Sequence, residues 1–403
     1  MPSPILVIDP ESAGLDLIAE LDRRGAAVTT WTQRTPFVQN VDGTKRPDAD
    51  LIEMAGAGGF SAVVPGGESG VSAAEWLSAH LGLPGSDPEY IFHRRDKDGM
   101  VSRVRDAGID AARSVLVRNS EDIAAAIEHT GLPAVLKPAN SAGSDLVRVV
   151  PSLPDANSHA ESIFGSTSIL GIENQEVVVQ EYLDGPQFHI NTVVIDGEHL
   201  VTEVYSDLFR MIDGAPQLYA GRTYRLDDPR IVDVVSYTLR CMEALGVRQG
   251  SSHSEVRVTS RGPILVEFNG RLMGPCQPTD YFVSAQGYSQ ATVWADVLTG
   301  EISTAREAIV LRDPRPTLGF YMLSAANAGR LIALDESALR DLPSYRGIYN
   351  APAIGDEVTI ENRTTTAEIG LILLADTDAG QVDRDIEAIA ELEASGAIHV
   401  VSI

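Results

Sequence analysis

The stretch EVRVTSRGPILVEFNGR, from Glu255 to Arg271, is the most informative part of this 403-residue chain. Its apolar residues fall into two short runs on either side of the turn Ser260-Arg261-Gly262. Short apolar runs bounded by turn residues are typical of β-strands. The stretch therefore predicts two adjacent strands, Ser252–Val258 and Pro263–Asn269, joined by that turn.

Three side chains with oxygen ligands fall on these two strands. Glu267 and Asn269 are two residues apart and share one face of their strand, which Glu255 on the neighbouring strand can also reach. Mg²⁺ prefers oxygen ligands and commonly bridges carboxylates to phosphates. Arg271, two residues further on, offers planar donors to a phosphate or a carboxylate. The pattern predicts a magnesium and phosphate site, although an exposed carboxylate face on an acidic protein would read the same way.

The composition limits the classes of partner. With 44% hydrophobic residues, the chain is long enough for two or three domains with buried cores. Its formal net charge of −26 argues against binding to nucleic acid or to anionic membranes. A site that binds phosphate must therefore contain a local cluster of positive side chains, in contrast to the net negative charge of the whole protein.

The sequence shows no signal for membrane insertion or secretion and no cysteine pattern typical of disulfides or zinc binding. No apolar stretch approaches the roughly 20 residues of a membrane helix, and the N-terminus lacks the pattern of a signal peptide. The two cysteines, Cys241 and Cys276, suggest neither a disulfide framework nor a zinc site. We expect a cytoplasmic protein.

Short apolar strands alternate with helical patterns in the first 90 or so residues, which predicts a small α/β domain with a parallel sheet. Its expected strands are residues 5–9, 26–31 and 62–65, and its expected helices are residues 14–24 and 71–81. A smaller α+β unit is expected beyond about residue 308, with short strands and a last helix at residues 379–393.

The middle of the chain combines helical patterns with short apolar runs. Helices are expected at residues 97–107, 120–129 and 231–245. Val177–Leu183 and Phe188–Ile195 are expected to form a hairpin-like pair. Residues 206–230 look irregular, and the aromatic segment Tyr205–Tyr224 suggests a substrate-facing or a surface loop.

Lysine occurs at only three positions, Lys45, Lys97 and Lys137. Lys137 ends an expected strand and precedes the small-residue loop Asn140-Ser141-Ala142-Gly143-Ser144. Such a loop lets backbone N–H groups approach a phosphate, and a lysine beside it adds a compact positive charge. An ordinary strand end followed by an ordinary connection would read the same way.

Two further segments are candidates for binding. Gln180-Glu181-Tyr182-Leu183 closes an expected strand, and its backbone and side chains could form a slot for adenine. His253 shares the face of Glu255, although a lone histidine is more often a packed polar residue. Each of these signals is weak alone.

Taken in order, these motifs resemble the ATP-grasp superfamily and, within it, carboxylate–amine ligases of the L-amino acid (dipeptide) ligase type. The resemblance implies an α/β fold in three parts. A Rossmann-like pre-ATP-grasp domain would cover residues 1–90, and two ATP-gripping lobes residues 91–305, with the lid lobe at about 115–185. A small α+β C-terminal subdomain would cover residues 306–403.

The resemblance also implies roles. Lys97 and Lys137 would hold the α- and β-phosphates, and a loop with Ser141, Gly143 and Ser144 would close over the nucleotide. The adenine contacts would be Gln180, Glu181, Tyr182 and Leu183. Two Mg²⁺ ions, or Mn²⁺ in their place, would be held by Glu255, Glu267 and Asn269. The catalytic residues would be Arg271, which stabilises an acyl phosphate, and His253.

Two positions depart from the family pattern. The family often has glutamate where this chain has Gln180, and again where it has Gln187, the position that usually meets the ribose. Glutamine can still form hydrogen bonds with adenine and with ribose hydroxyls. ATP binding is therefore expected to survive these changes.

The expected activity is the joining of an amino acid-like carboxylate to an amine, with ADP and phosphate as products. The expected partners are the small-molecule acid and amine, with no nucleic acid and no membrane; similar enzymes are often dimers, which leaves a homodimer open. One alternative is a carboxylase-like or purine-pathway enzyme that uses bicarbonate or formate. Another is a nucleotide-binding protein without turnover.

Overall fold

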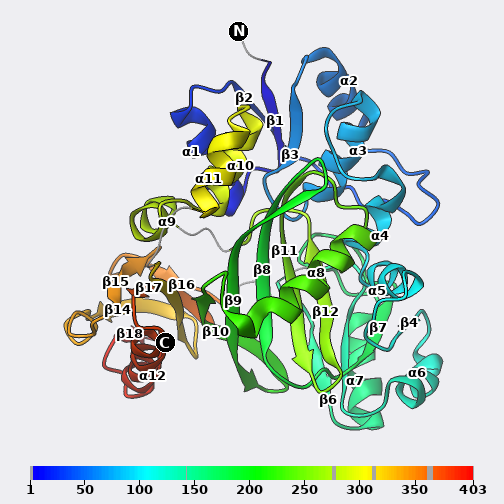
Figure 1. Ribbon diagram of the computed structural model, residues 1–403. Coiled ribbons are helices and arrows are strands. Elements are labelled where there is room, and N and C mark those ends of the chain that lie inside the picture. Colours follow the sequence, from blue (N-terminus) through cyan, green and yellow to red (C-terminus); the bar gives the residue numbers. More distant parts are fainter. Residues whose placement is uncertain (1–2, 142, 275–277, 311–314, 361–365, 403) are drawn as a thin grey trace.

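The computed structural model describes residues 3–141, 143–274, 278–310, 315–360 and 366–402. Within these ranges the strands form four sheets with helices packed against them, which confirms the predicted α/β class (Figure 1). None of the described helices has the length and apolarity needed to cross a membrane.

The first sheet is parallel and lies near the N-terminus. In the order β2-β1-β3 it contains β1 (Ile5–Ile8), β2 (Val28–Trp31) and β3 (Ala62–Pro65). The helices of this unit are α1 (Ala13–Arg23), α2 (Ala49–Ala57) and α3 (Val71–Leu81). All four residues of β1 are buried, as expected for the central strand of a sheet covered on both faces. The predicted parallel sheet is confirmed.

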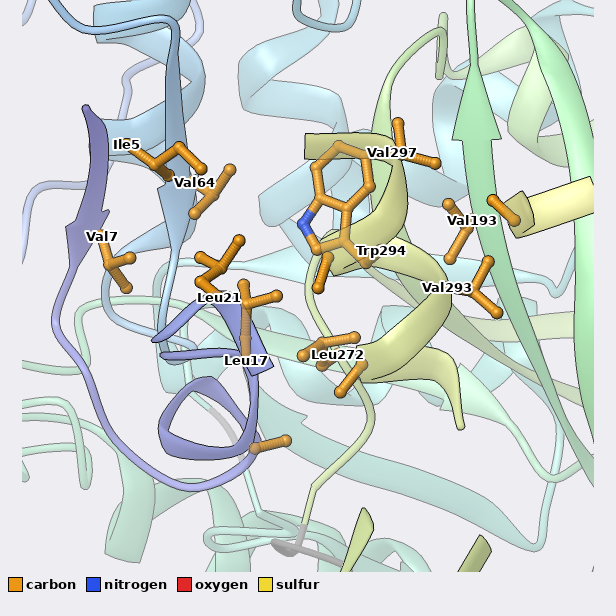
Figure 2. Close-up of a cluster of buried hydrophobic side chains, with 14 of the residues drawn as sticks. Ile5, Val7, Leu17, Leu21, Val64, Val193, Leu272, Val293, Trp294 and Val297 are labelled. Carbon is orange, nitrogen blue, oxygen red and sulfur yellow. The ribbon is translucent and has the colours of Figure 1, made fainter. Parts of the chain in front are cut away.

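An apolar core joins this unit to the rest of the molecule. The indole of Trp294 packs with Val64 of β3 and with Leu17 and Leu21 of α1. The same cluster includes Val193, which lies on a strand of the largest sheet (Figure 2). This packing sets the position of the N-terminal unit relative to the largest sheet.

A second sheet has four antiparallel strands in the order β4-β7-β5-β6. These are β4 (Ser114–Val117), β5 (Ala134–Pro138), β6 (Arg148–Val150) and β7 (Val177–Glu181). Helices α6 (Ile123–Thr130) and α7 (Leu153–Ile163) pack on one face of it. The residues of β5 and β7 that alternate with this core, Val135, Lys137 and Gln180, line a cavity on the other face.

The largest sheet has eight antiparallel strands in the order β12-β11-β8-β9-β10-β13-β17-β15. Its first five strands are β8 (Gln187–Ile195), β9 (Glu198–Ile212), β10 (Ala215–Tyr224), β11 (Gly250–Thr259) and β12 (Gly262–Asn269). The other three are β13 (Thr317–Ala325), β15 (Tyr345–Tyr349) and β17 (Ala367–Asp376). Because β13, β15 and β17 come from the C-terminal part of the chain, that part completes this sheet.

Helices cover both faces of the largest sheet. Helices α5 (Lys97–Asp106) and α8 (Val232–Ala244) pack on one face of β8, β11 and β12. On the other face lie α9 (Thr279–Gln286) and α10 (Gln290–Leu298), followed by α11 (Ile302–Val310). Helix α12 (Ala379–Ala394) packs against β13 and β17.

The remaining elements are short. A small sheet, in the order β16-β14-β18, contains β14 (Gly329–Leu334), β16 (Glu357–Val358) and β18 (His399–Ser402). Helix α4 (Ile91–Arg95) precedes α5, and short 3₁₀ turns occupy Pro88–Tyr90, Ser120–Asp122 and Pro229–Ile231. The domain divisions at residues 90 and 305 stay predictions.

The predicted hairpin between Val177–Leu183 and Phe188–Ile195 is wrong. Strand β7 belongs to the four-stranded sheet and β8 to the eight-stranded sheet, so the intervening turn connects two sheets. Gly185 in this turn has a φ of +98°, and a Cβ at that position would lie 2.2 Å from the carbonyl oxygen of Val258. The close approach of the turn to β11 requires a glycine here.

The segment 206–230 is also more regular than predicted, because β9 and β10 form a long hairpin and not a loop. Asp213 and Gly214 both have positive φ angles, of 50° and 80°, and connect Ile212 to its partner Ala215. Asp-Gly is the preferred pair for this tight hairpin turn. The Asp213-Gly214 pair is therefore a local sequence signal for this hairpin.

Candidate active site

A cavity of about 600 Å³ lies between the four-stranded sheet and the eight-stranded sheet. Every residue predicted for the site lines this cavity, although the positions lie far apart in the sequence. They are Lys97, Lys137, Ser141, Gly143, Ser144, Gln180, Glu181, Tyr182, Leu183, Gln187, His253, Glu255, Glu267, Asn269 and Arg271. Ala142 of the loop lies outside the described residues, as does Cys276.

The two predicted carboxylates lie directly opposite each other. In the register of β11 and β12, Glu255 pairs with Glu267, and His253 pairs with Asn269. Residues paired in this way have Cβ atoms about 5 Å apart. The register shifts immediately after Glu255, so the strand pair is irregular next to the carboxylates. The two strands thus place two carboxylates and an amide on one wall of the cavity.

Two buried lysines give the acidic protein a local basic site. The Nζ atom of Lys97 lies 2.9 Å from Oε1 of Glu267 and donates a hydrogen bond of 2.6 Å to the carbonyl oxygen of Ser141. Lys137 is also buried. Burial, helped by the charge of Lys97, lowers the pKa of Lys137 to about 8. Two buried cations that line one cavity favour an anionic ligand.

Glu255 is held by residues of β8. Gln187 Nε2 donates to Glu255 Oε2 at 2.9 Å, and His189 Nε2 lies 3.4 Å from Glu255 Oε1. Burial alone would raise the pKa of Glu255, but the hydrogen bond and charge of His189 bring it to about 2. Glu255 is therefore an anion at neutral pH.

Sequence reasoning missed His189 and its partner on β9. His189 Nδ1 lies 2.5 Å from Oδ2 of Asp207, and both residues line the cavity. Gln187, His189 and Asn191 alternate with apolar residues along β8. That alternation was a signal that the strand has one polar face.

The strand end that was predicted to contact adenine is already partly engaged. The carboxylate of Glu181 accepts hydrogen bonds from Arg113 Nε at 2.9 Å and from Arg261 Nη2 at 2.5 Å. Tyr182 N donates to the carbonyl oxygen of Pro133 at 3.3 Å. In contrast, Nε2 of Gln180 is buried and has no hydrogen-bond partner among the described residues. The amide of Gln180 is thus the free donor at this end of the cavity.

Gln187 and the turn before it are held by Arg257. The guanidinium donates from Nε to Gln187 Oε1 at 3.1 Å and from Nη1 to the carbonyl oxygen of Leu183 at 3.0 Å. Gln187 in turn donates to Glu255. The side-chain amide of Gln187 is therefore held at both its oxygen and its nitrogen. A ribose hydroxyl that binds Gln187 would have to share the amide with Arg257 and Glu255.

Arg271 lies two residues past the end of β12 and lines the cavity. Its Nε atom donates to Oε2 of Glu68 at 2.5 Å, and Arg95 Nη1 lies 3.5 Å from Oε1 of the same carboxylate. Burial would raise the pKa of Glu68, but the charges of Arg271 and Arg95 bring it to about 2. No local pattern identifies Glu68 as a site residue, because it comes from the loop that follows β3.

His253 is buried between charged groups. Burial and the positive charge of Arg271 lower the pKa of His253 to about 3, so the ring is neutral at neutral pH. Its Nδ1 atom has no hydrogen-bond partner among the described residues. A neutral imidazole can donate or accept one hydrogen bond at each nitrogen.

The small-residue loop is tied down at its far end. Ser141 Oγ donates to Oδ2 of Asp145 at 2.7 Å, and Ile169 N donates to the same oxygen at 3.1 Å. Gly143 and Ser144 have positive φ angles of 61° and 59°. The loop therefore turns sharply where it borders the cavity.

The donor set fits a hard divalent cation. Two carboxylates and the amide of Asn269 supply oxygen ligands, which are the type Mg²⁺ prefers. No group of three or more His, Cys, Asp or Glu side chains in the described part of the chain is arranged as a metal site. The candidate ligands on β11 and β12 are two carboxylates and one amide, so phosphate oxygens would have to supply further ligands.

Comparisons with known proteins show which sequences and folds this chain resembles. A family described as "ATP-grasp domain" matches residues 130–280. The chain is 27% identical over 341 residues to dapdiamide A synthase from Enterobacter agglomerans, covering 83% of this chain and 80% of that protein. It is 30% identical over 286 residues to phosphoribosylamine–glycine ligase from Streptomyces coelicolor, covering 66% of this chain and 60% of that protein.

A solved structure shares the fold along nearly the whole chain. The crystal structure of an L-amino acid ligase from Bacillus licheniformis superposes with a TM-score of 0.76 at 16% identity. The superposition covers 96% of this chain and 97% of that one.

Proposed function

This chain belongs to the ATP-grasp superfamily, and we propose that it joins an amino acid-like carboxylate to an amine through an acyl phosphate, releasing ADP and phosphate. The observation that carries the proposal is the single cavity that brings together two buried lysines, two opposed carboxylates and Arg271. Nucleotide, metal and acyl group would then occupy one continuous space.

The nucleotide would lie along the four-stranded sheet. Lys97 and Lys137 would contact the α- and β-phosphates, since they are the buried cations next to the small-residue loop. The unpartnered amide of Gln180 supports an adenine contact at the far end of the cavity. Tyr182 and Leu183 would line the adenine slot, and Glu181 would contribute backbone contacts while its carboxylate stays with Arg113 and Arg261.

ATP-grasp enzymes use ATP with divalent metal ions, and we propose two Mg²⁺ ions here, with Mn²⁺ as a substitute. Glu255, Glu267 and Asn269 would hold them. When bound, the metal neutralises charge on the phosphates. Lys97 contacts Glu267 and would then share that carboxylate with the metal.

The chemistry has two balanced steps. An oxygen of the substrate carboxylate attacks the γ-phosphorus, the bond to the bridging oxygen breaks, and ADP leaves with that electron pair. The nitrogen of a neutral amine then attacks the acyl carbon, and the carbon–oxygen bond to the phosphate breaks. The amide forms, phosphate leaves, and one proton is released from the nitrogen.

Arg271 and His253 would lie where charge develops in these steps. The guanidinium of Arg271 lines the cavity and would stabilise the acyl phosphate and the oxyanion formed by amine attack. The neutral ring of His253 would donate or accept a hydrogen bond to the substrate or to the phosphate. Enclosure of the acyl phosphate would limit its hydrolysis.

The ligase proposal is better supported than its alternatives. The relatives reported above are named as a synthase and as a ligase. A non-catalytic nucleotide-binding protein would not need every predicted reactive residue in one cavity. The expectations of a homodimer and of a cytoplasmic location stay predictions.

A phosphate-release screen tests the proposal. The full chain is incubated with Mg²⁺ and ATP, and pairs of amino acids are compared with single amino acids and with bicarbonate or formate. We expect phosphate release that requires both an acid and an amine, and an amide product by mass spectrometry. Stimulation by bicarbonate alone, without any amine-dependent product, would contradict it.

A further inference from the structure

The carboxylate of Glu255 is held at both of its oxygens by residues of β8. Oε2 accepts a hydrogen bond of 2.9 Å from Gln187 Nε2, and Oε1 lies 3.4 Å from His189 Nε2. In the register of β8 and β11, His189 stands directly opposite Glu255. Each carboxylate oxygen has two acceptor positions, so both oxygens can also bind a cation that lies in the cavity. Glu255 thus combines a fixed orientation with free acceptor positions.

The amide at position 187 suits this arrangement. Gln187 donates to Glu255 through Nε2 and accepts a hydrogen bond from Arg257 at Oε1. A carboxylate in its place would face the carboxylate of Glu255 at hydrogen-bond distance, and two like charges this close are unfavourable. Two positions on the polar face of β8, Gln187 and His189, therefore serve the same candidate metal ligand.

His189 is itself held by a second carboxylate. Asp207 on β9 stands opposite Gln187 in the register of β8 and β9, which places it diagonally next to His189 on the same face. Its Oδ2 atom lies 2.5 Å from His189 Nδ1, and its side chain has no exposed area. With a carboxylate at each ring nitrogen, His189 can donate to both only if both nitrogens carry a hydrogen. Asp207 thus sets the orientation of the ring that reaches Glu255.

The two opposed carboxylates of the cavity have different cationic partners. Lys97 contacts Glu267 and the carbonyl oxygen of Ser141, so one of its three N–H donors remains for a phosphate. Both nitrogens of His189 are instead directed to carboxylates. His189 therefore has no donor left for the nucleotide, although it lines the cavity. Its contacts are those of a group that acts through Glu255.

We propose that His189, held by Asp207, is a positioning residue that fixes the carboxylate of Glu255 in the orientation needed to bind the metal ion. The inference rests on the proposed function through its metal site, and it does not depend on which acid or amine reacts. Partners that orient a metal ligand commonly contribute about 10- to 100-fold to metal affinity. Without His189, the carboxylate of Glu255 would keep Gln187 at one oxygen and would be free to turn at the other.

Metal binding measured without any acid or amine tests this inference. Mn²⁺ is titrated into the full chain in the presence of saturating ADP, and free Mn²⁺ is followed by electron paramagnetic resonance, with ADP alone as the blank. His189→Leu should raise the Kd for Mn²⁺ about 10- to 100-fold. The affinity for ADP measured without metal should stay within about twofold, because Lys97 and Lys137 share no partner with His189.

Two amide variants distinguish a positioning role from a packing role. The side-chain nitrogen of a glutamine can occupy the place of the histidine Nε2 atom, and that of an asparagine the place of Nδ1. His189→Gln keeps a donor for Glu255 and should recover most of the affinity for Mn²⁺, whereas His189→Asn should stay close to His189→Leu. A role in packing alone would not rank the two amides in this order.

Asp207→Asn tests the contact behind His189. It should raise the Kd for Mn²⁺ in the same direction, and adding it to His189→Leu should change the Kd no further, because Asp207 acts through His189. Additive losses in the double variant would contradict this order of contacts. His199→Leu is the control, since His199 is a partly buried histidine near the start of β9 that does not line the cavity, and the Kd should stay unchanged.

The outcomes separate this inference from the function on which it rests. An unchanged Kd for Mn²⁺ in His189→Leu, or equal affinities of the two amide variants, overturns the positioning role and leaves the ligase proposal standing. If the variants rank as expected but no pair of acid and amine yields an amide, the ligase proposal fails and the positioning role stands. If the wild type does not retain Mn²⁺ with ADP, the metal assignment and this inference both fail. If His189→Leu does not fold, the ranking of His189→Gln and His189→Asn decides.

Discussion

Glu68 and Arg271 form an ion pair of 2.5 Å between Oε2 and Nε, although 203 positions separate them in the sequence. Glu68 comes from the loop after β3 of the parallel sheet, and Arg271 follows the last strand of the active-site wall. The pair therefore connects the N-terminal unit to the cavity. It also orients the guanidinium that we propose to act on the acyl phosphate.

Replacing Glu68 with glutamine should destabilise the protein, because Arg271 and Arg95 would both lose their shared anion. The depression of the Glu68 pKa from 4.5 to about 2 corresponds to about 3 kcal/mol of unfolding free energy. Urea denaturation measures this loss. Glu357→Gln serves as the control: its carboxylate is exposed and lies 3.9 Å from Arg330, so the change should stay below about 1 kcal/mol.

The same pair predicts a pH dependence of stability. The folded-state pKa of Glu68 is depressed, so its contribution is fully present above the unfolded value of 4.5. It is lost as the pH falls from 4.5 towards 2. The difference in unfolding free energy between wild type and Glu68→Gln should be constant above about pH 5.5 and shrink below it. A difference that grows on acidification would contradict this account.

Glu267→Ala should abolish ATP-dependent phosphate release, because it removes one of the two opposed carboxylates and frees Lys97. We expect a loss of at least about 100-fold in kcat, with folding retained by circular dichroism. Glu307→Ala, an exposed change on α11, should leave the rate unchanged. Turnover of Glu267→Ala at the wild-type rate would show that the metal assignment is wrong.

Gly185→Ala should destabilise the connection between the two sheets. The added Cβ would lie 2.2 Å from the carbonyl oxygen of Val258. Gly82→Ala is the matched control, since Gly82 also has a positive φ, of 66°, but has open space around it. Backbone strain alone costs about 1 kcal/mol, so thermal and urea unfolding should show a clearly larger loss for Gly185→Ala. Equal losses of unfolding free energy in the two variants would mean that the turn at residue 185 can move away from Val258 at little cost.

Trp294→Ala should loosen the N-terminal unit. Trp294 is 3% exposed and packs with residues of α1, β3 and β8 (Figure 2). Truncating a buried tryptophan costs about 3–5 kcal/mol. Val41→Ala, at a side chain that is 74% exposed, should change the unfolding free energy by less than about 0.5 kcal/mol. Urea denaturation of both variants gives the comparison.

Much of the secondary structure was readable from the sequence. Helices α3, α5 and α12 agree with their predicted bounds within one residue, and the pair β11–β12 lies where the stretch Glu255–Arg271 indicated. These elements depend on local periodicity and on short turns, which neighbouring residues determine. The missed β9–β10 hairpin also had a local signal, the Asp213-Gly214 turn. The strands of this hairpin, β9 and β10, mix aromatic, charged and glycine residues, so they lack the apolar run that is typical of a buried strand.

Local pattern alone therefore determined the strand pair, the opposed carboxylates and the scarce lysines of this protein. It could not determine that β7 and β8 belong to different sheets, or that Glu68 and His189 contact the predicted residues. Those relationships depend on how sheets and helices from distant parts of the chain pack against one another. The free energy of that packing comes from buried surface shared between segments, and no single segment records it.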